Sequence, residues 1–189
     1  YTQGMAGEDP VYRRTIPALK HFCANNNEKN RGSCSANVTP RTLHEYYYRA
    51  FEGAVVRGGA DSMMAAYNEL SGVPACMNPD LQHVVKDQWH LGFVVTDSAD
   101  FTQNVLMHHA FATHAEALAA CLKNGCHIAL DTDAHSTTQL QGNMPPLLAM
   151  LEEMQFPQEL VVNATRQNLV NELKLHGRIC AEYIGGEIL

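Results

Sequence analysis

Short apolar runs alternate with helical patterns along the chain. Between and after the runs, apolar residues recur every three or four positions, as they do on one face of an α-helix. The runs themselves end in polar residues and have the composition of buried parallel strands, which are apolar on both faces. They are 15–22 (TIPALKHF), 61–68 (DSMMAAYN), 93–97 (FVVTD) and 126–133 (CHIALDTD). The pattern predicts the order β-α-β-α-β-α-β-α.

Capping residues indicate where the helices begin and end. Thr39 before Pro40 is a cap followed by a first-turn proline, and Asn78 before Pro79 repeats the arrangement. Gly125 stands where a third helix would stop. Helices are therefore expected from Pro40 to Gly58, within 78–92, within 114–125 and after Pro157.

Alternating strands and helices indicate a parallel sheet with right-handed crossovers. In an α/β barrel, function lies at the C-terminal ends of successive strands, whereas an open sheet concentrates it at one switch point. Here every predicted strand ends in chemically capable residues: Lys20 with His21, Tyr67 with Asn68, Asp97, and Asp131 with Asp133. Four βα units are half of an eight-stranded barrel. We therefore predict an α/β fold, the second half of a (β/α)8 TIM-like barrel.

Composition and charge narrow the range of partners. The chain is 46% hydrophobic and 17% charged, which is ordinary for a soluble globular protein. Its net charge of −7, without a basic cluster, argues against nucleic acid or a membrane surface as the partner. No apolar stretch reaches the roughly 20 residues of a membrane-spanning helix. Because the chain begins at Tyr1, we expect it to be a piece of a longer protein, and its compartment stays open.

The six cysteines have neither zinc-ligand spacing nor a C-x-x-C pair. Free buried thiols are therefore favoured, because cysteine behaves as a small hydrophobic residue. The even number also permits disulfides. Both states remain open.

Asp97 directly follows the apolar run from Phe93 to Thr96. A carboxylate just beyond a buried strand faces a concave site with fixed backbone geometry, which suits a nucleophile. An aspartate at this place can instead cap the next segment. The pattern alone leaves both interpretations open.

Two long stretches resemble a known family. They are KHFCANNNEKNR (20–31) and SMMAAYNELSGVPACMNPDLQHVVKDQWHLGFVVTDSADF (62–101), and they resemble the N-terminal barrel domain of glycoside hydrolase family 3, mostly β-glucosidases, β-xylosidases and β-N-acetylhexosaminidases. The resemblance runs in order from GEDP (7–10) to about Gly177. It implies that residues 1–177 are the second half of the barrel domain and that 178–189 are a tail or the start of a linker. The hexosaminidase branch has KHFPGHG where this chain has KHFCANN.

The resemblance implies a retaining, exo-acting glycoside hydrolase of the β-glucosidase or β-xylosidase type. Such an enzyme removes the non-reducing terminal sugar of a β-linked oligosaccharide or glycoside through a covalent glycosyl-aspartate. By position, the nucleophile is Asp97. The implied sugar-binding residues are Lys20, His21, Arg31, Met64 and Tyr67. No cofactor and no metal is implied.

Two departures from the family pattern limit what is carried over. Ser98 stands where many members place a tryptophan after the nucleophile, which leaves the sugar open. The acid/base usually comes from a later domain or a mobile loop, so the implied partners are the rest of the barrel and an acid/base domain. Glu69 and Asp100 are acid/base candidates by residue type alone.

Two further functions remain as alternatives. A metal-dependent barrel hydrolase would use histidines and carboxylates as ligands, here His21, Asp97, His108, His109, His114 and Asp131. Against it, no H-x-H follows the first strand, and the segment MHHAFATH (107–114) is expected in a loop. The other alternative is a non-catalytic half-barrel that needs a partner chain.

Overall fold

The chain divides into two compact units, Tyr1–Leu118 and Ala119–Leu189. The computed structural model describes residues 1–9, 12–97, 100–123, 136–142, 144–153, 155–165, 167–168 and 170–171. The predicted strand at 126–133, Gly125 and the predicted tail at 178–189 lie outside these residues.

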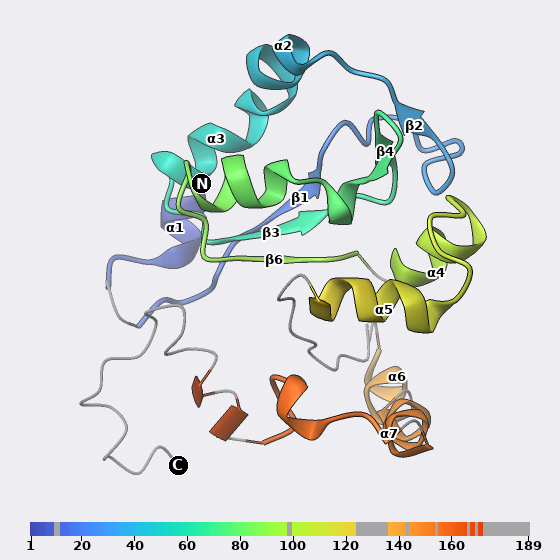
Figure 1. Ribbon diagram of the computed structural model, residues 1–189. Helices are drawn as coiled ribbons and strands as arrows, with labels where there is room; N and C mark the ends of the chain where they lie inside the picture. Colours follow the sequence, from blue (N-terminus) through green and yellow to red (C-terminus); the bar gives the residue numbers. More distant parts are fainter. Residues whose placement is uncertain are drawn as a thin grey trace. The chain divides into compact units, whose positions relative to one another are not determined.

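A three-stranded parallel sheet organises the first unit (Figure 1). Its strands lie in the order β1 (Ala18–Phe22), β3 (Ser62–Ala65) and β6 (Phe93–Val95). Three of the predicted strands are thus confirmed as parallel and adjacent. All three are shorter than the predicted runs, and β1 begins after Pro17, which has no N–H to contribute to a ladder.

The register of the sheet separates its two faces. Met63 lies opposite Val94, and both pack in or against the apolar core. Met64 lies opposite Val95 on the other face, because successive side chains of a strand alternate between faces. Phe93 and Val95 are 39% and 38% exposed. One face of this sheet is therefore covered within the unit and the other presents apolar side chains.

The helical segment after β1 begins and ends as predicted. It consists of α2 (Pro40–Thr42), the π-helical turn η1 (Leu43–Tyr47) and α3 (Arg49–Val56). The Thr39 hydroxyl accepts a hydrogen bond from the Thr42 N–H at 3.2 Å, as expected of a cap. The segment ends before Gly58, and Gly59 then has a φ of +66°.

The next helical segment also uses its predicted cap. The 3-10 turn η2 (Ala75–Met77) precedes the π-helical segment η3 (Leu81–Lys86). Between them, Asn78 Oδ1 accepts a hydrogen bond from the Asp80 N–H at 2.9 Å. α5 (His114–Lys123) lies where the third helix was predicted.

Several elements of the first unit were not predicted. They are α1 (Thr2–Ala6), α4 (Asp100–Leu106) and a small sheet of β2 (Ser35–Ala36), β4 (Glu69–Leu70) and β5 (Val73–Pro74). β2 pairs parallel to β4, and β4 pairs antiparallel to β5. Ser71 and Gly72, with φ of +49° and +84°, form the two-residue hairpin turn, which requires left-handed backbone at both positions.

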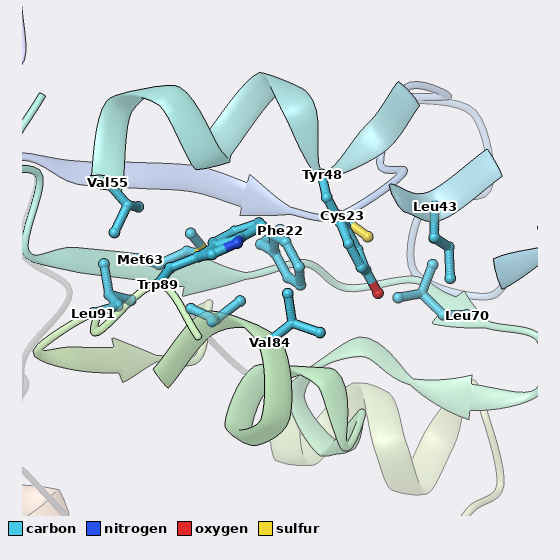
Figure 2. Packing of buried hydrophobic residues seen from close by; sticks show 11 residues of the cluster. Phe22, Cys23, Leu43, Tyr48, Val55, Met63, Leu70, Val84, Trp89 and Leu91 are labelled. Atoms are coloured by element: carbon cyan, nitrogen blue, oxygen red, sulfur yellow. The ribbon is translucent and has the colours of Figure 1, made fainter. Parts of the chain in front are cut away.

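Aromatic side chains fill the core beneath the sheet (Figure 2). Phe22 stacks on Tyr48 with ring centroids 5.2 Å apart and meets Phe51 and Trp89 edge-on at 5.1 and 6.2 Å. Such pairs add to the stabilisation that burial itself provides. Phe22 is the last residue of β1 and directly follows His21. Its packing therefore anchors the strand end at which His21 lies.

The second unit contains α6 (Thr137–Gly142), α7 (Met144–Glu153) and the 3-10 turn η4 (Gln158–Leu160). The helix predicted after Pro157 is interrupted: residues 158–160 form a 3-10 turn, residues 162–165 form turns and bends, and helical backbone returns at 167–168 and 170–171. Asn168 Nδ2 donates to the carbonyl oxygens of Gln158 and Val161 at 2.8 and 2.9 Å, and each of these oxygens also accepts a hydrogen bond from the backbone N–H three residues later. Consecutive β-branched residues, Val161 and Val162, also disfavour helix.

Of the helices in the described ranges, none is long and apolar enough to cross a membrane.

Candidate functional site

The carboxylate of Asp97 lies where three strands of the parallel sheet end. Asp97 follows β6 by two residues, and its Oδ2 lies 3.1 Å from Nε2 of His21, on β1. The hydroxyl of Tyr67, two residues beyond β3, donates a hydrogen bond to the same carboxylate. The side chains of His21 and Asp97 are 21% and 15% exposed, so the carboxylate is held but reachable.

Tyr67 remains a proton donor because its surroundings oppose ionisation. Burial raises its pKa most, and the charge of Asp97 and the hydrogen bond to that carboxylate raise it further. Asp100 adds to the increase, and the Arg31 guanidinium opposes it. A neutral hydroxyl therefore faces Asp97 at physiological pH.

Arg31 lies over the Tyr67 ring, with its guanidinium carbon 5.4 Å from the ring centroid. Such a position is attractive because a cation favours the electron-rich face of an aromatic ring. Its Nη1 also lies 3.2 Å from a carboxylate oxygen of Glu28, which is 85% exposed. Arg31 is thus part of the same cluster without being buried in it.

Contacts therefore link four of the six residues predicted for the site, namely His21, Arg31, Tyr67 and Asp97. Lys20 and Met64 lie near the same strand ends. Lys20 is exposed and directly precedes His21 in β1. Met64 in β3 lies opposite Val95 in β6.

Asp100 supports the backbone of Asp97. It is the first residue of α4, and it is 2% exposed. Its Oδ2 accepts a hydrogen bond from the Asp97 N–H at 3.2 Å, and its own N–H donates to the Asp97 carbonyl at 3.3 Å. Burial raises the pKa of Asp100 to about 8. The hydrogen bond from the Asp97 N–H lowers this pKa, and the negative charge of Asp97 raises it. The two aspartates lie three positions apart in the sequence, which is close enough for these local contacts.

His108 and Glu69 lie behind Tyr67, on the backbone side. The Nε2 of His108 is 2.6 Å from the Tyr67 carbonyl oxygen, and its Nδ1 is 3.6 Å from Oε1 of Glu69. By residue type, the sequence offers His108 as a metal ligand and Glu69 as an acid/base candidate. No local pattern could have placed them together, because His108 is 41 residues from Tyr67.

Other candidates for the metal alternative have different surroundings. His114 Nε2 lies 3.2 Å from the Thr102 hydroxyl, and Asp131 lies outside the described residues. In the ranges that the structure describes, no three side chains of His, Cys, Asp or Glu gather as a metal site. Cys23, Cys34 and Cys76 are free thiols, and of these three Cys23 is buried, as the favoured interpretation expects. Burial raises the pKa of the Cys23 thiol to about 12.

A half-buried carboxylate held by an imidazole and a phenol can attack an electrophilic carbon or stabilise a developing cation. Its two neighbours fix its orientation, and its remaining exposure leaves room for one substrate atom.

Comparisons with known proteins agree on one family. The family model for the glycosyl hydrolase family 3 N terminal domain matches residues 1–170. Thermostable beta-glucosidase B of Acetivibrio thermocellus is 44% identical over 81 residues, 42% of this chain and 11% of that protein. Beta-D-xylosidase 3 of Arabidopsis thaliana is 31% identical over 140 residues, 69% of this chain and 18% of that protein. The chain therefore spans less than a fifth of these two relatives.

Solved structures show the same fold. A GH3 exo-beta-xylosidase, XlnD, has a TM-score of 0.62 at 24% identity, covering 94% of this chain and 23% of that one. A β-glucosidase from Erythrobacter marinus has a TM-score of 0.63 at 22% identity, covering 95% of this chain and 23% of that one.

Proposed function

The chain belongs to glycosyl hydrolase family 3, and from this membership we propose that it carries the nucleophile and part of the sugar site of a retaining, exo-acting glycoside hydrolase. The β-glucosidase or β-xylosidase type is proposed because relatives bear both names. Residues 1–177 would form the second half of the barrel, with the first half and the acid/base contributed by the rest of the protein.

One observation supports the assignment of the nucleophile above all. Asp97 Oδ2 lies 3.1 Å from His21 Nε2, and the Asp97 carboxylate accepts a hydrogen bond from the Tyr67 hydroxyl, at the C-terminal end of a parallel strand. In the proposed reaction, an Asp97 oxygen attacks the anomeric carbon and the bond to the leaving-group oxygen breaks. A carboxylic acid from elsewhere protonates that oxygen. Water then attacks the same carbon, gives its proton to the acid/base and releases Asp97.

The neighbouring residues have distinct roles in this proposal. His21 and Tyr67 hold the carboxylate toward the sugar, and Lys20 and Arg31 donate hydrogen bonds to sugar hydroxyls. Met64 supplies apolar contact. Glu69 faces His108 and Asp100 bonds the Asp97 backbone, so neither is assigned as the acid/base. This favours an acid/base supplied by another part of the protein.

A mechanism-based label tests the proposal in the whole protein that carries this chain. A 2-fluoro glycoside with a good leaving group should form a stable glycosyl-enzyme, found by mass spectrometry on the peptide that contains Asp97. The Asp97→Asn variant is the control and should remain unlabelled. An active protein that is labelled on another peptide, or not at all, contradicts the proposal. A protein that binds glycosides without turnover supports the non-catalytic alternative.

A further inference from the structure

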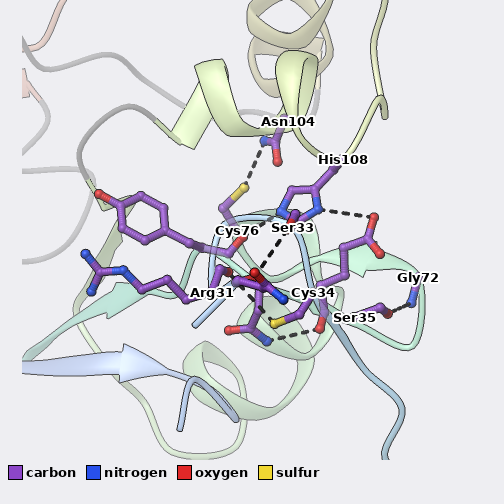
Figure 3. A network of polar contacts seen from close by, with 12 residues as sticks. Arg31, Ser33, Cys34, Ser35, Gly72, Cys76, Asn104 and His108 are labelled. Atoms are coloured by element: carbon purple, nitrogen blue, oxygen red, sulfur yellow. Dashed lines mark hydrogen bonds and ion pairs between the residues drawn. The ribbon is translucent and has the colours of Figure 1, made fainter. Parts of the chain in front are cut away.

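The His108–Glu69 pair occupies a buried position that the proposed reaction does not use. The His108 side chain is 1% exposed and that of Glu69 is 17% exposed. Figure 3 shows His108 within a group of polar contacts, near Asn104 and Cys76. A buried imidazole with both nitrogens directed at polar atoms is held firmly, because leaving either unpaired would carry a desolvation penalty.

The contacts determine which ring nitrogen carries a proton. A carbonyl oxygen only accepts hydrogen bonds, so His108 Nε2 must donate to the Tyr67 carbonyl, 2.6 Å away. The other nitrogen, Nδ1, lies 3.6 Å from Oε1 of Glu69, and this contact is attractive when Nδ1 carries a proton as well. A carboxylate at that position orients the ring, as carboxylates do behind functional histidines.

Helix α4 connects this pair to the nucleophile. Its first residue, Asp100, forms two hydrogen bonds with the Asp97 backbone. The last residue of α4 is Leu106, and His108 lies two positions after it. His108 binds the backbone carbonyl of Tyr67. In the middle, Asn104 Nδ2 donates to Cys76 Sγ at 3.2 Å. Helix α4 and the two residues after it therefore contact the backbones of both Asp97 and Tyr67.

We propose that His108, oriented by Glu69, is a positioning residue that holds the Tyr67 backbone so that the Tyr67 hydroxyl stays on Asp97. This inference rests on the proposed function. Without the Nε2 donor, the carbonyl of Tyr67 would lose its buried partner and the segment after β3 would shift. Displacements of about 1 Å at a reacting group lower rates by about 100-fold.

Two amide variants differ mainly in where they place a donor. In His108→Gln, the amide nitrogen lies near the position of Nε2 and can still donate to Tyr67. In His108→Asn, it lies near the position of Nδ1 and leaves that carbonyl unpaired. The rate constant for labelling by the 2-fluoro glycoside is measured in the whole protein, and circular dichroism checks the fold of each variant. We expect a decrease of about 10- to 100-fold for His108→Asn and of less than about threefold for His108→Gln.

The His108→Gln and His108→Asn variants are then compared in a Tyr67→Phe background. If His108 acts through the Tyr67 hydroxyl, His108→Asn should change the labelling rate less than about threefold there, because coupled residues are not additive. Equal losses in both backgrounds would indicate general packing and overturn the inference. So would a wild-type rate for His108→Asn, or equal losses for the Gln and Asn variants. If the wild-type protein is active but is not labelled at Asp97, the proposed function fails instead.

Discussion

Asp97 takes part in two sets of contacts. Its carboxylate is held by His21 and Tyr67, while its backbone N–H and carbonyl bond to Asp100 at the start of α4. Different atoms of Asp97 thus make different contacts. The backbone binds the first residue of α4, and the carboxylate is held by His21 and Tyr67. The contacts with Asp100 involve only the backbone of Asp97, so substitution of the side chain tests what the carboxylate itself does.

Replacing Asp97 by Ala should abolish turnover without unfolding the protein. If Asp97 attacks the anomeric carbon, Asp97→Ala removes the nucleophile and kcat should fall by several orders of magnitude. Azide should restore part of the turnover of an activated aryl glycoside and give the product of inverted configuration. A residue that only capped α4 would instead lower the free energy of unfolding by about 0.5–2 kcal/mol and leave kcat largely intact.

Asp100 should make stability decrease as the pH rises. Its pKa is raised from 3.8 to about 8 by burial, so between these values the folded protein holds a proton that the unfolded chain has lost. The free energy of unfolding should then fall with increasing pH, by at most about 1.4 kcal/mol per pH unit, and level off above about pH 8. Asp100→Asn removes this titration.

The measurement compares thermal unfolding of the wild-type protein and Asp100→Asn at pH 5, 7 and 9. The wild-type protein should lose stability relative to the variant as the pH rises from 5 to about 8. A difference that does not change with pH would show that Asp100 ionises alike in the folded and unfolded protein.

The elements near the site are determined by turns and caps. The β4–β5 hairpin holds Glu69 in place for His108, and its turn needs left-handed backbone at Ser71 and Gly72. A side chain added at Gly72 would have nothing within 4 Å, so strain in the backbone would be its main effect.

Gly72→Ala should therefore destabilise the protein by about 1–2 kcal/mol. Gly4→Ala is the matched control, because Gly4 lies in α1, has open space around it and should gain about 0.5–1 kcal/mol from the higher helix propensity of alanine. Thermal unfolding of both variants tests the comparison. Equal effects of the two substitutions would contradict the argument from backbone conformation.

Across the first unit, the parallel sheet presents unpaired edges and an apolar face. In the described part of the chain, β1 and β6 each pair along one side only. Phe93 and Val95 are more than a third exposed on the face opposite the core. In a complete barrel of the proposed kind, further strands would pair with these edges and the interior would enclose this face.

We therefore expect the isolated 189-residue chain to be poorly soluble or oligomeric. Open strand edges and apolar faces favour association, because pairing and burial both lower the free energy. Size-exclusion chromatography with light scattering, on the chain alone and on the longer protein, makes the comparison. A monodisperse chain that unfolds cooperatively at high concentration would count against the half-barrel.

The sequence by itself determined the features that depend on neighbours along the chain. The caps at Thr39 and Asn78 and the order of the three described strands all follow from local spacing. The family resemblance in KHFCANNNEKNR and VVTD also led to His21, Arg31 and Asp97, which the structure brings together with Tyr67.

Tertiary structure alone decided the contacts between distant segments. The helix expected after Pro157 is interrupted at 161–165, where Asn168 donates to two backbone carbonyl oxygens, a contact that apolar periodicity does not reveal. His108 meets Tyr67 across 41 residues, and the burial that raises the pKa of Asp100 exists only once α4 has packed. Periodicity and capping operate over a few residues, whereas burial and electrostatics depend on which segments meet in space.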